Sequence, residues 1–543
     1  MDEVNIAGLV SVIIFYVLIL GIGIFAARKA ANATTTDVLV AGRDMGWIVS
    51  FFTLTASQVG GAYINGTAEI MASSGLVWAQ APLGYCIAMI IAGNVYAPRM
   101  RRAGYVTLFD PFQIKLGNKV GTLMCFPQFL GDIFWTAAIL SALGSTVSII
   151  LSIDRTISII SSACVAVFYT LLGGLWSVAY TDVVQLICIA IGLVVAVPFA
   201  MTHESVDLDR IDNTWKGEIQ TPHIGLYIDV CFLLVFGGIP WQEFFQRALA
   251  CKTVQRARIS ALVGSFGMIL FAIPSALMGV AGSAADWNQT AYNGTIPIPP
   301  EKMSYILPLV LQYLCPLPVS IIGMGAIAAA VMSSADSGIL SSASVFTKNI
   351  YVQLIRTKAS DREVIWVLRI AVVVSGALGT ALALSANSVY GLYIMCGDLM
   401  YVILFPQFTC VLFLEVTNGY GSIVGFFLSC ILRILGGEPY LGLEPIIKYP
   451  FYTDEFGQNF PFRTLIMICS FIAIISVSKL TEVLFKGQYL PQKLDILGCA
   501  DPDYRTRLRI PSDDRKEHEM QELNPAVLYD HKNMSDSLLR KGQ

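Results

Sequence analysis

Oxygen-bearing side chains are concentrated in one otherwise apolar stretch of the sequence, residues 328–337. Ser333 and Ser334 supply adjacent hydroxyl groups, and Asp336 follows about one helical turn later. Small residues beside them, including Ala330, leave backbone carbonyl groups accessible. Hard cations prefer hydroxyl, carboxylate and carbonyl oxygens, so these residues predict a sodium site. The alternative interpretation is a packing face with hydrogen bonds between helices, but a packing face does not explain the carboxylate of Asp336.

Two other apolar stretches are interrupted by residues that break or loosen a helix. Residues 56–66 contain three glycines together with Ser57 and Gln58, and residues 237–242 combine a glycine pair with Pro240. Inside a membrane, such interruptions free backbone groups that can bind a ligand. The alternative is that the glycines only let neighbouring helices approach closely.

Aromatic residues occur close to these interruptions on several different stretches: Tyr63, Tyr85, Trp135 and Trp241. A group of aromatic faces can hold an organic cation such as a quaternary ammonium. A single tryptophan in a membrane span more often anchors the span at the interface or fills the core, so the prediction depends on the coincidence with the interruptions.

These residues lie in a chain of 543 residues that is 55% hydrophobic and only 13% charged, with a mean hydropathy of +0.66. This composition excludes a soluble globular enzyme and a disordered chain, and indicates an all-α polytopic membrane protein. A net charge of −3 gives no support to a nucleic-acid partner. Apolar runs long enough to cross a bilayer predict about thirteen spans. They lie near 5–27, 47–70, 78–97, 120–147, 156–176, 182–202, 225–246, 258–281, 318–346, 364–386, 388–414, 419–436 and 461–482.

The distribution of charge predicts the orientation of the spans. Acidic residues precede the first span whereas Arg28 and Lys29 follow it, which places the N-terminus outside and argues against a cleaved signal peptide. Thirteen spans then place the C-terminus in the cytoplasm, and the loops assigned to the inside carry most of the Lys and Arg residues. N-glycosylation acceptors at Asn288 and Asn293 fall in a loop assigned to the outside.

The two interrupted spans each head a block of five spans, residues 47–202 and 225–414. Because five is odd, the blocks have opposite orientations, as in the inverted repeats of secondary transporters. Residues 1–46 and 415–482 supply the remaining spans, and residues 483–543 are expected to form a cytoplasmic, disordered tail. The residues alone therefore indicate sodium-coupled transport of a small organic solute.

The other acids and the histidines complete this prediction. Asp182, at the start of the sixth span, either faces the same cavity or caps a cytoplasmic helix, and the sequence leaves both open. Five further acids are expected to lie near solvated span ends: Glu69, Asp132, Glu243, Asp398 and Glu438. An enzyme is not expected, because all four histidines fall in loops or the tail: His203, His223, His518 and His531.

Seven motifs together closely resemble the choline transporters of the sodium/solute symporter family. The resemblance covers residues 5–490. The motifs are YINGTAE (63–69), WAQAP (78–82), DPF (110–112), SVAYTDVVQ (177–185), GGIPWQ (237–242), AVMSSADS (330–337) and GGEP (436–439).

The resemblance implies a LeuT-like 5+5 inverted repeat of thirteen spans. It also implies chloride-dependent choline uptake driven by sodium, which supplies acetylcholine synthesis, in the presynaptic plasma membrane and synaptic vesicles. Three residues would form the choline cage: Tyr85, Trp135 and Trp241. The sodium ligands would be the carbonyls of Ala56, Val59 and Ala330 and the hydroxyls of Ser333 and Ser334. Asp182 matches an acid near that site, and Asp336 an acid that serves a second sodium.

One departure from the family pattern affects the expected substrate. Gln58 stands where the resemblance implies a tryptophan, so an amide replaces one aromatic wall of the cage. Smaller departures are Asp132 in place of Glu, Gly338 in place of Ser and Tyr393 in place of Trp. They suggest a divergent paralogue, with another small amine or a polyol as the alternative substrate. A ligand-gated channel or a solute sensor would be the alternative activity.

Overall fold

The structure, a computed structural model, describes residues 6–29, 41, 45–151, 153–207, 209, 215–386, 388–438, 442–454 and 456–499. Helices dominate this part of the chain, where β-pairing is limited to isolated bridges. Nine of its helices are long and apolar enough to cross a membrane, and four shorter apolar helices accompany them. The predicted all-helical, multi-pass membrane architecture is therefore confirmed.

Among the described residues, the first predicted block and the helix before it contain nine α-helices, some of them short. A π-helix, η3 (Ala92–Tyr96), joins α5 to α6. The α-helices are α1 (Ile6–Lys29), α3 (Trp47–Gln58), α4 (Gly61–Ser74), α5 (Ala81–Ile91), α6 (Ala97–Arg102), α7 (Asp110–Leu116), α8 (Asn118–Leu123), α9 (Cys125–Leu151) and α10 (Arg155–Met201), with α11 (Ile224–Gly237) opening the second block.

The second block and the last two long helices also consist of α-helices, and two of the long helical segments contain π-helical turns. These turns are η8 (Phe346–Ile355) and η9 (Met400–Leu404). The α-helices are α12 (Gln242–Ala250), α13 (Val254–Ala284), α14 (Ile306–Tyr313), α15 (Leu317–Val345), α16 (Asp361–Ser385), α17 (Val389–Leu399), α18 (Phe405–Phe413), α19 (Gly419–Leu435) and α20 (Phe462–Lys486). The short 3₁₀ turns are η2 (Leu76–Trp78), η5 (Thr221–His223), η6 (Trp287–Gln289), η7 (Pro300–Tyr305) and η11 (Gln492–Leu494).

Both predicted interruptions are breaks in the helices. The span predicted at 47–70 divides into α3 and α4, and the span predicted at 225–246 divides into α11 and α12. The start of α3 also meets the end of α12, because the amide of Met45, just before α3, donates to the carbonyl of Ala250 at 3.2 Å. The two broken segments are therefore tied together directly.

The predicted fifth and sixth spans are not separate helices. α10 is continuous over 47 residues and includes the expected boundary between 176 and 182. At about 1.5 Å per residue, such a helix is about 70 Å long, more than twice the thickness of a bilayer core. The sequence indicated a break, because the pair Gly173 and Gly174 just before this boundary is typical of a turn, yet the helix continues through it.

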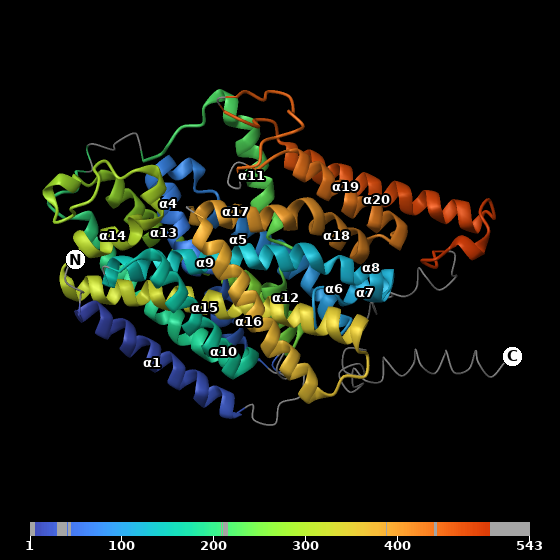
Figure 1. Cartoon of the computed structure of the whole chain (residues 1–543), viewed down its shortest axis with the longest axis horizontal. Helices are drawn as coiled ribbons and strands as arrows, with labels where there is room; N and C mark the ends of the chain where they lie inside the picture. The colour runs from blue at the N-terminus through green and yellow to red at the C-terminus, as the bar shows by residue number, and fades with distance from the viewer. Residues whose placement is uncertain are drawn as a thin grey trace.

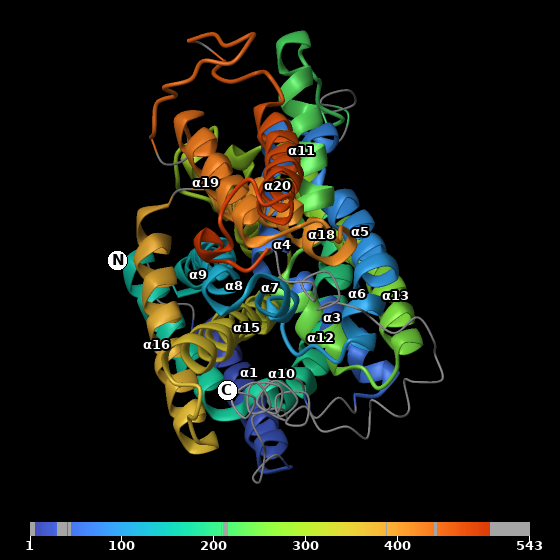
Figure 2. The same ribbon diagram turned by 90° about the vertical axis from the view of Figure 1, so that its right-hand side faces the viewer.

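A group of buried helices forms the centre of the molecule. α15 contacts α9 and α10 extensively, and α9 contacts α17. Nearly every residue of α15 from Gly323 onward is buried, including its run of serines. Figures 1 and 2 show α1 on one side of these helices and α19 with α20 on the opposite side. The oxygen-rich stretch of the sequence is thus placed at the core of the bundle.

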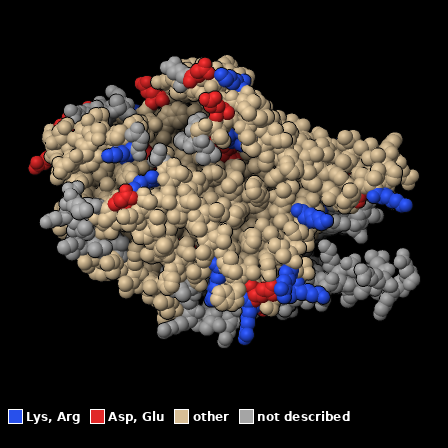
Figure 3. All heavy atoms as spheres, in the orientation of Figure 1, with Lys and Arg blue, Asp and Glu red and all other residues tan. Residues whose placement is uncertain are grey.

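The outer surface suits a lipid environment. Large apolar side chains are exposed along α1, α13 and α16, among them Phe25, Phe266 and Ile370. On the face drawn in Figure 3, the described charged residues gather toward the upper left and lower right, and a broad region between them carries none. Such a surface is expected where lipid replaces water.

The beginning of the predicted disordered tail is folded. α20 continues to Lys486, and the segment up to Cys499 returns to α19, where the amide of Leu497 donates to the Tyr420 hydroxyl at 3.3 Å. Residues 500–543, the rest of the predicted tail, lie outside the described residues.

Candidate solute and sodium site

The break between α3 and α4 leaves backbone oxygens without helical partners. α3 ends at Gln58, and Val59 (φ −84°, ψ 61°) and Gly60 (φ −98°, ψ −176°) both lie outside helical geometry. In the described part of the chain, the Val59 carbonyl accepts no backbone hydrogen bond, and the Gly60 amide does not bond the Ala56 carbonyl as it would in a continuous helix. These are two of the carbonyls predicted to bind sodium.

α15 packs its oxygen-bearing residues directly against this break. A Cβ atom on Gly60 would lie 1.4 Å from Ser334 Oγ and 3.6 Å from the carbonyl oxygen of Ala330. Ser334 Oγ in turn donates to that carbonyl at 3.2 Å. The fold therefore brings together the break, Ala330 and Ser334, and only a glycine at position 60 permits this approach.

Asp182 lies beside the same group, in the interior of α10, and is fully buried. Its carboxylate accepts a hydrogen bond from Ser333 Oγ at 2.5 Å and another from Thr53 Oγ1 of α3. It forms an ion pair with Arg247 at 3.4 Å. Of the two interpretations that the sequence left open, the helix cap is therefore wrong, because Asp182 is neither at a helix end nor in contact with solvent.

Arg247 was not predicted, yet it connects four helices. Its guanidinium donates to the carbonyl and hydroxyl of Thr53 at 3.1 and 3.0 Å and to Ser337 Oγ at 2.5 Å, besides pairing with Asp182. The predicted span ended at residue 246, so Arg247 fell just outside it and was not considered as a residue of the site. The signal available in the sequence was an arginine directly after an interrupted apolar stretch, because a charge at such a place needs a partner.

Aromatic rings from four helical segments meet near the second break. The centroid distances are 6.1 Å between Trp135 and Trp241, 5.4 Å between Trp135 and Tyr393, and 5.3 Å between Tyr85 and Tyr393. All four side chains are buried. The three predicted cage residues thus lie together, and Tyr393, which the sequence marked only as a departure, joins them through α17.

Gln58 and Tyr63, the two remaining residues predicted near the breaks, differ in their hydrogen bonding. Gln58 is half-buried at the end of α3, and no described residue forms a hydrogen bond with its side chain. Tyr63 is buried in α4, and its hydroxyl donates to the Met268 carbonyl of α13 at 2.8 Å. Gln58 therefore keeps a free amide, whereas the Tyr63 hydroxyl is already engaged in holding two helices together.

Three further acids lie near the centre of the bundle: Asp132, Glu243 and Asp336, all fully buried. Asp132 accepts hydrogen bonds from Gln128 at 2.6 Å and Ser341 at 3.4 Å. Both carboxylate oxygens of Glu243 and of Asp336 lack a hydrogen-bond partner among the described residues. The prediction that Asp132 and Glu243 lie at solvated span ends is wrong, because other helices cover the ends on which they lie.

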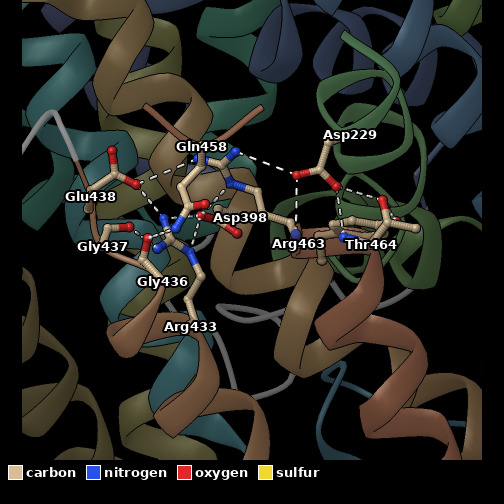
Figure 4. Close-up of polar contacts among 10 residues, drawn as sticks. Asp229, Asp398, Arg433, Gly436, Gly437, Glu438, Gln458, Arg463 and Thr464 are labelled. Carbon is tan, nitrogen blue, oxygen red and sulfur yellow. Dashed lines mark hydrogen bonds and ion pairs between the residues drawn. The ribbon is translucent and has the colours of Figure 1, made fainter. Parts of the chain in front are cut away.

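The predicted solvated positions of Asp398 and Glu438 are also wrong. Both are buried in a cluster with two arginines, shown in Figure 4. Arg433 Nε donates to Asp398 at 2.6 Å, and its Nη2 pairs with Glu438. Arg463 Nε donates to the same oxygen of Asp398 at 3.1 Å. Burial is tolerated here because each carboxylate has a cationic partner.

The same cluster fastens α20 to the broken helix. Asp229 of α11 accepts hydrogen bonds from the amide of Arg463 at 3.2 Å and from the amide and hydroxyl of Thr464 at 2.7 and 2.6 Å. Glu69, the last of the five acids, is buried as well and accepts from Ser388 Oγ at 2.7 Å and the Tyr390 amide at 3.2 Å. These acids link helices to one another.

The two predicted glycosylation acceptors lie in the segment between α13 and α14. Asn288 and Asn293 are both exposed. The side-chain amide of Asn288 donates to Asp286 at 3.1 Å, within the turn η6. Their exposure is what an acceptor asparagine needs.

Comparison with known proteins identifies the class of protein that this fold and site define. The profile of the sodium:solute symporter family matches residues 38–429. A solved structure of a Na⁺-coupled sialic acid symporter, in its substrate-bound outward-open state, superposes with a TM-score of 0.70 at 17% identity, covering 87% of this chain and 98% of that one. The chain belongs to the sodium:solute symporter family.

Within that family, the chain is most informatively compared with two animal proteins. It is 49% identical over 502 residues to high-affinity choline transporter 1 of Drosophila melanogaster, with 92% of this chain and 82% of the relative covered. It is 48% identical over 514 residues to high affinity choline transporter 1 of Homo sapiens, with 91% and 89% covered. These relatives are transporters, so the prediction that the chain is not an enzyme is confirmed.

Proposed function

We propose that the protein is a sodium-coupled choline symporter that works by alternating access. The observation that carries the proposal is the meeting of two broken helices with an oxygen-lined helix and a group of aromatic rings. Discontinuous helices of this kind bind substrate and ions in secondary transporters. The relatives named as choline transporters support choline as the substrate.

Sodium would bind between the α3–α4 break and α15. Its ligands would be the carbonyls of Ala56, Val59 and Ala330 and the hydroxyls of Ser333 and Ser334. Gly60 supports this assignment, because it lets Ser334 come against the break. Asp182 would compensate part of the ion's charge through Ser333, and Asp336, with two unpartnered oxygens, would serve a second sodium.

The ammonium of choline would contact the faces of Tyr85, Trp135 and Trp241, and Gln58 would bind the hydroxyl end. The rings of Trp135 and Trp241 are adjacent, with centroids 6.1 Å apart, and Tyr393 links Tyr85 to Trp135, with its centroid 5.3 Å from that of Tyr85 and 5.4 Å from that of Trp135. A cation within about 6 Å of several ring centroids is stabilised by each of them. Blocks 47–202 and 225–414 would act as the inverted repeats that move around this site.

Uptake of radiolabelled choline into cells that express the protein tests the coupling. Replacement of sodium by lithium or N-methylglucamine is expected to abolish uptake, and equal uptake in the three media would contradict the proposal. Replacement of chloride tests the proposed chloride dependence in the same assay. Surface labelling in neurons tests the proposed presynaptic location.

The free amide of Gln58 favours a second candidate, symport of another small amine or of a polyol. Competition against sodium-dependent choline uptake separates the candidates, because the true substrate should compete most strongly. Currents far larger than the measured flux would instead indicate a channel, and binding without flux a sensor.

A further inference from the structure

Glu243 is a buried carboxylate that no contact so far explains. It lies in the first turn of α12, directly after the second helix break, and is fully buried. Neither of its side-chain oxygens has a hydrogen-bond partner among the described residues. A buried carboxylate without partners is costly, so a position of this kind indicates a missing cation or donor.

The surroundings of Glu243 belong to the aromatic group. The indole N–H groups of Trp135 and Trp241 both approach the carboxylate, without either one reaching hydrogen-bond geometry. A Cβ atom on Gly338 would lie 3.1 Å from Glu243 Oε1 and 3.0 Å from Trp135 Cδ1. The carboxylate therefore lies between two rings of the proposed cage, in space that a glycine leaves open.

The nearby guanidinium does not neutralise Glu243. Arg247 lies one turn further along α12, but its N–H groups are directed to Thr53, Ser337, Asp182 and the main-chain carbonyl of Glu243. It reaches that carbonyl at 3.3 Å and forms no ion pair with the side chain.

The charges around this position favour a positively charged ligand. Asp132, Asp182 and Asp336 lie within electrostatic range of Glu243 or of one another. Four buried carboxyl groups thus lie in a region where Arg247 is the cation that pairs with one of them, Asp182, at 3.4 Å. Sodium ions at the proposed sites near Asp182 and Asp336 would leave Glu243 as the acid next to the aromatic rings.

We propose that Glu243 binds the charged head of the transported amine, and that the site therefore accepts protonated amines carrying an N–H group at least as well as quaternary ones. This proposal rests on the proposed function and specifies its substrate class. A quaternary ammonium supplies charge but no donor, whereas a protonated tertiary amine supplies both to the two free oxygens.

Inhibition of sodium-dependent choline uptake by three probes tests the proposal in the unmodified protein. The probes are unlabelled choline, its tertiary amine N,N-dimethylethanolamine, and the uncharged isostere of choline with carbon in place of nitrogen. The tertiary amine is expected to inhibit at a concentration equal to or below that of choline, and the isostere to be at least tenfold weaker than both. A tertiary amine tenfold weaker than choline would overturn the proposal.

Variants at position 243 identify the residue responsible. Glu243→Gln keeps the size of the side chain and removes its charge. Relative to choline, the tertiary amine should therefore inhibit at least tenfold more weakly in this variant than in the unmodified protein. Glu243→Asp should retain part of the preference for the tertiary amine. An unchanged ratio of the two inhibitory concentrations in Glu243→Gln, as expected if the carboxyl group always carries a proton, would overturn the proposal.

The two proposals fail in different ways. Choline uptake that does not depend on sodium in the unmodified protein would contradict the symport itself. Sodium-dependent uptake combined with a weak tertiary amine would contradict only the role of Glu243. If Glu243→Gln does not reach the cell surface, the ratio in Glu243→Asp and in the unmodified protein still decides the outcome.

Discussion

Two buried residues of opposite charge, Asp182 and Arg247, lie beside the proposed sodium site. Asp182 and Arg247 are both fully buried and satisfy each other, with Thr53, Ser333 and Ser337 supplying the remaining hydrogen bonds. Removing one partner of such a pair leaves the other charge uncompensated. The pair therefore holds α3, α10, α12 and α15 in one arrangement, next to the oxygens proposed to bind sodium.

Replacing Asp182 with Asn is expected to destabilise the protein by about 3–5 kcal/mol, because Arg247 would lose its buried partner. The double variant Asp182→Asn with Arg247→Gln should recover part of that loss, since neither charge remains. Unfolding transitions of the purified proteins in detergent measure both effects. A double variant whose loss equals the sum of the two single losses would show that the residues do not interact.

Replacing Gln58 with Trp is expected to raise the affinity for choline, because an aromatic face would be added to the cage. A cation–π contact at a desolvated site contributes on the order of 2 kcal/mol, which corresponds to about a thirtyfold change. Concentration dependence of sodium-driven uptake measures the change. Unchanged or lower affinity would mean that Gln58 does not line the cage.

At the scale of helices, the sequence predicted the features that depend only on residues close together in the chain. Glycine and proline marked both breaks, and the serines of α15 marked the oxygen-rich face, because these residues act on the backbone nearby. Glu243 and Asp398 were misplaced, since burial by neighbouring helices is decided by contacts distant in sequence. Tyr393 joined the aromatic group for the same reason, through the position of α17 beside α9.

Replacing Gly60 with Ala should abolish uptake, because the added Cβ atom would lie 1.4 Å from Ser334 Oγ and force α15 away from the break. Gly46→Ala is the matched control at the start of the same helix, where no atom lies within 4 Å of the new Cβ. Uptake together with surface expression distinguishes loss of function from loss of folding. Normal uptake by Gly60→Ala would contradict the close packing of α15 on the break.

The buried cluster of Asp229, Asp398, Arg433, Glu438 and Arg463 predicts a separate effect on stability. Arg463→Leu should destabilise the protein by about 3–5 kcal/mol, because it leaves buried carboxylates short of a cation. Lys448→Ala is the control, since the Lys448–Asp454 pair is 56% and 88% exposed, and it should leave stability nearly unchanged. Equal effects in denaturant unfolding would show that the buried cluster does not hold α20 in place.

The whole molecule combines an apolar surface with a polar, charged centre. Charge is scarce in the sequence at 13% of residues, yet several acids and arginines are concentrated between buried helices. Such an arrangement is unfavourable in a purely structural protein and is expected where ions and a charged solute bind and leave. The position of α1 and of α19 with α20 on opposite sides leaves the central helices between them, where the proposed repeats would move.

Accumulation of choline in proteoliposomes that contain only the purified protein tests the central claim most directly. With an inward sodium gradient, labelled choline should rise inside above its external concentration, and it should fall back when an ionophore dissipates the gradient. Vesicles with a potassium gradient of the same size should only equilibrate. Equal accumulation without a sodium gradient would contradict sodium-coupled symport.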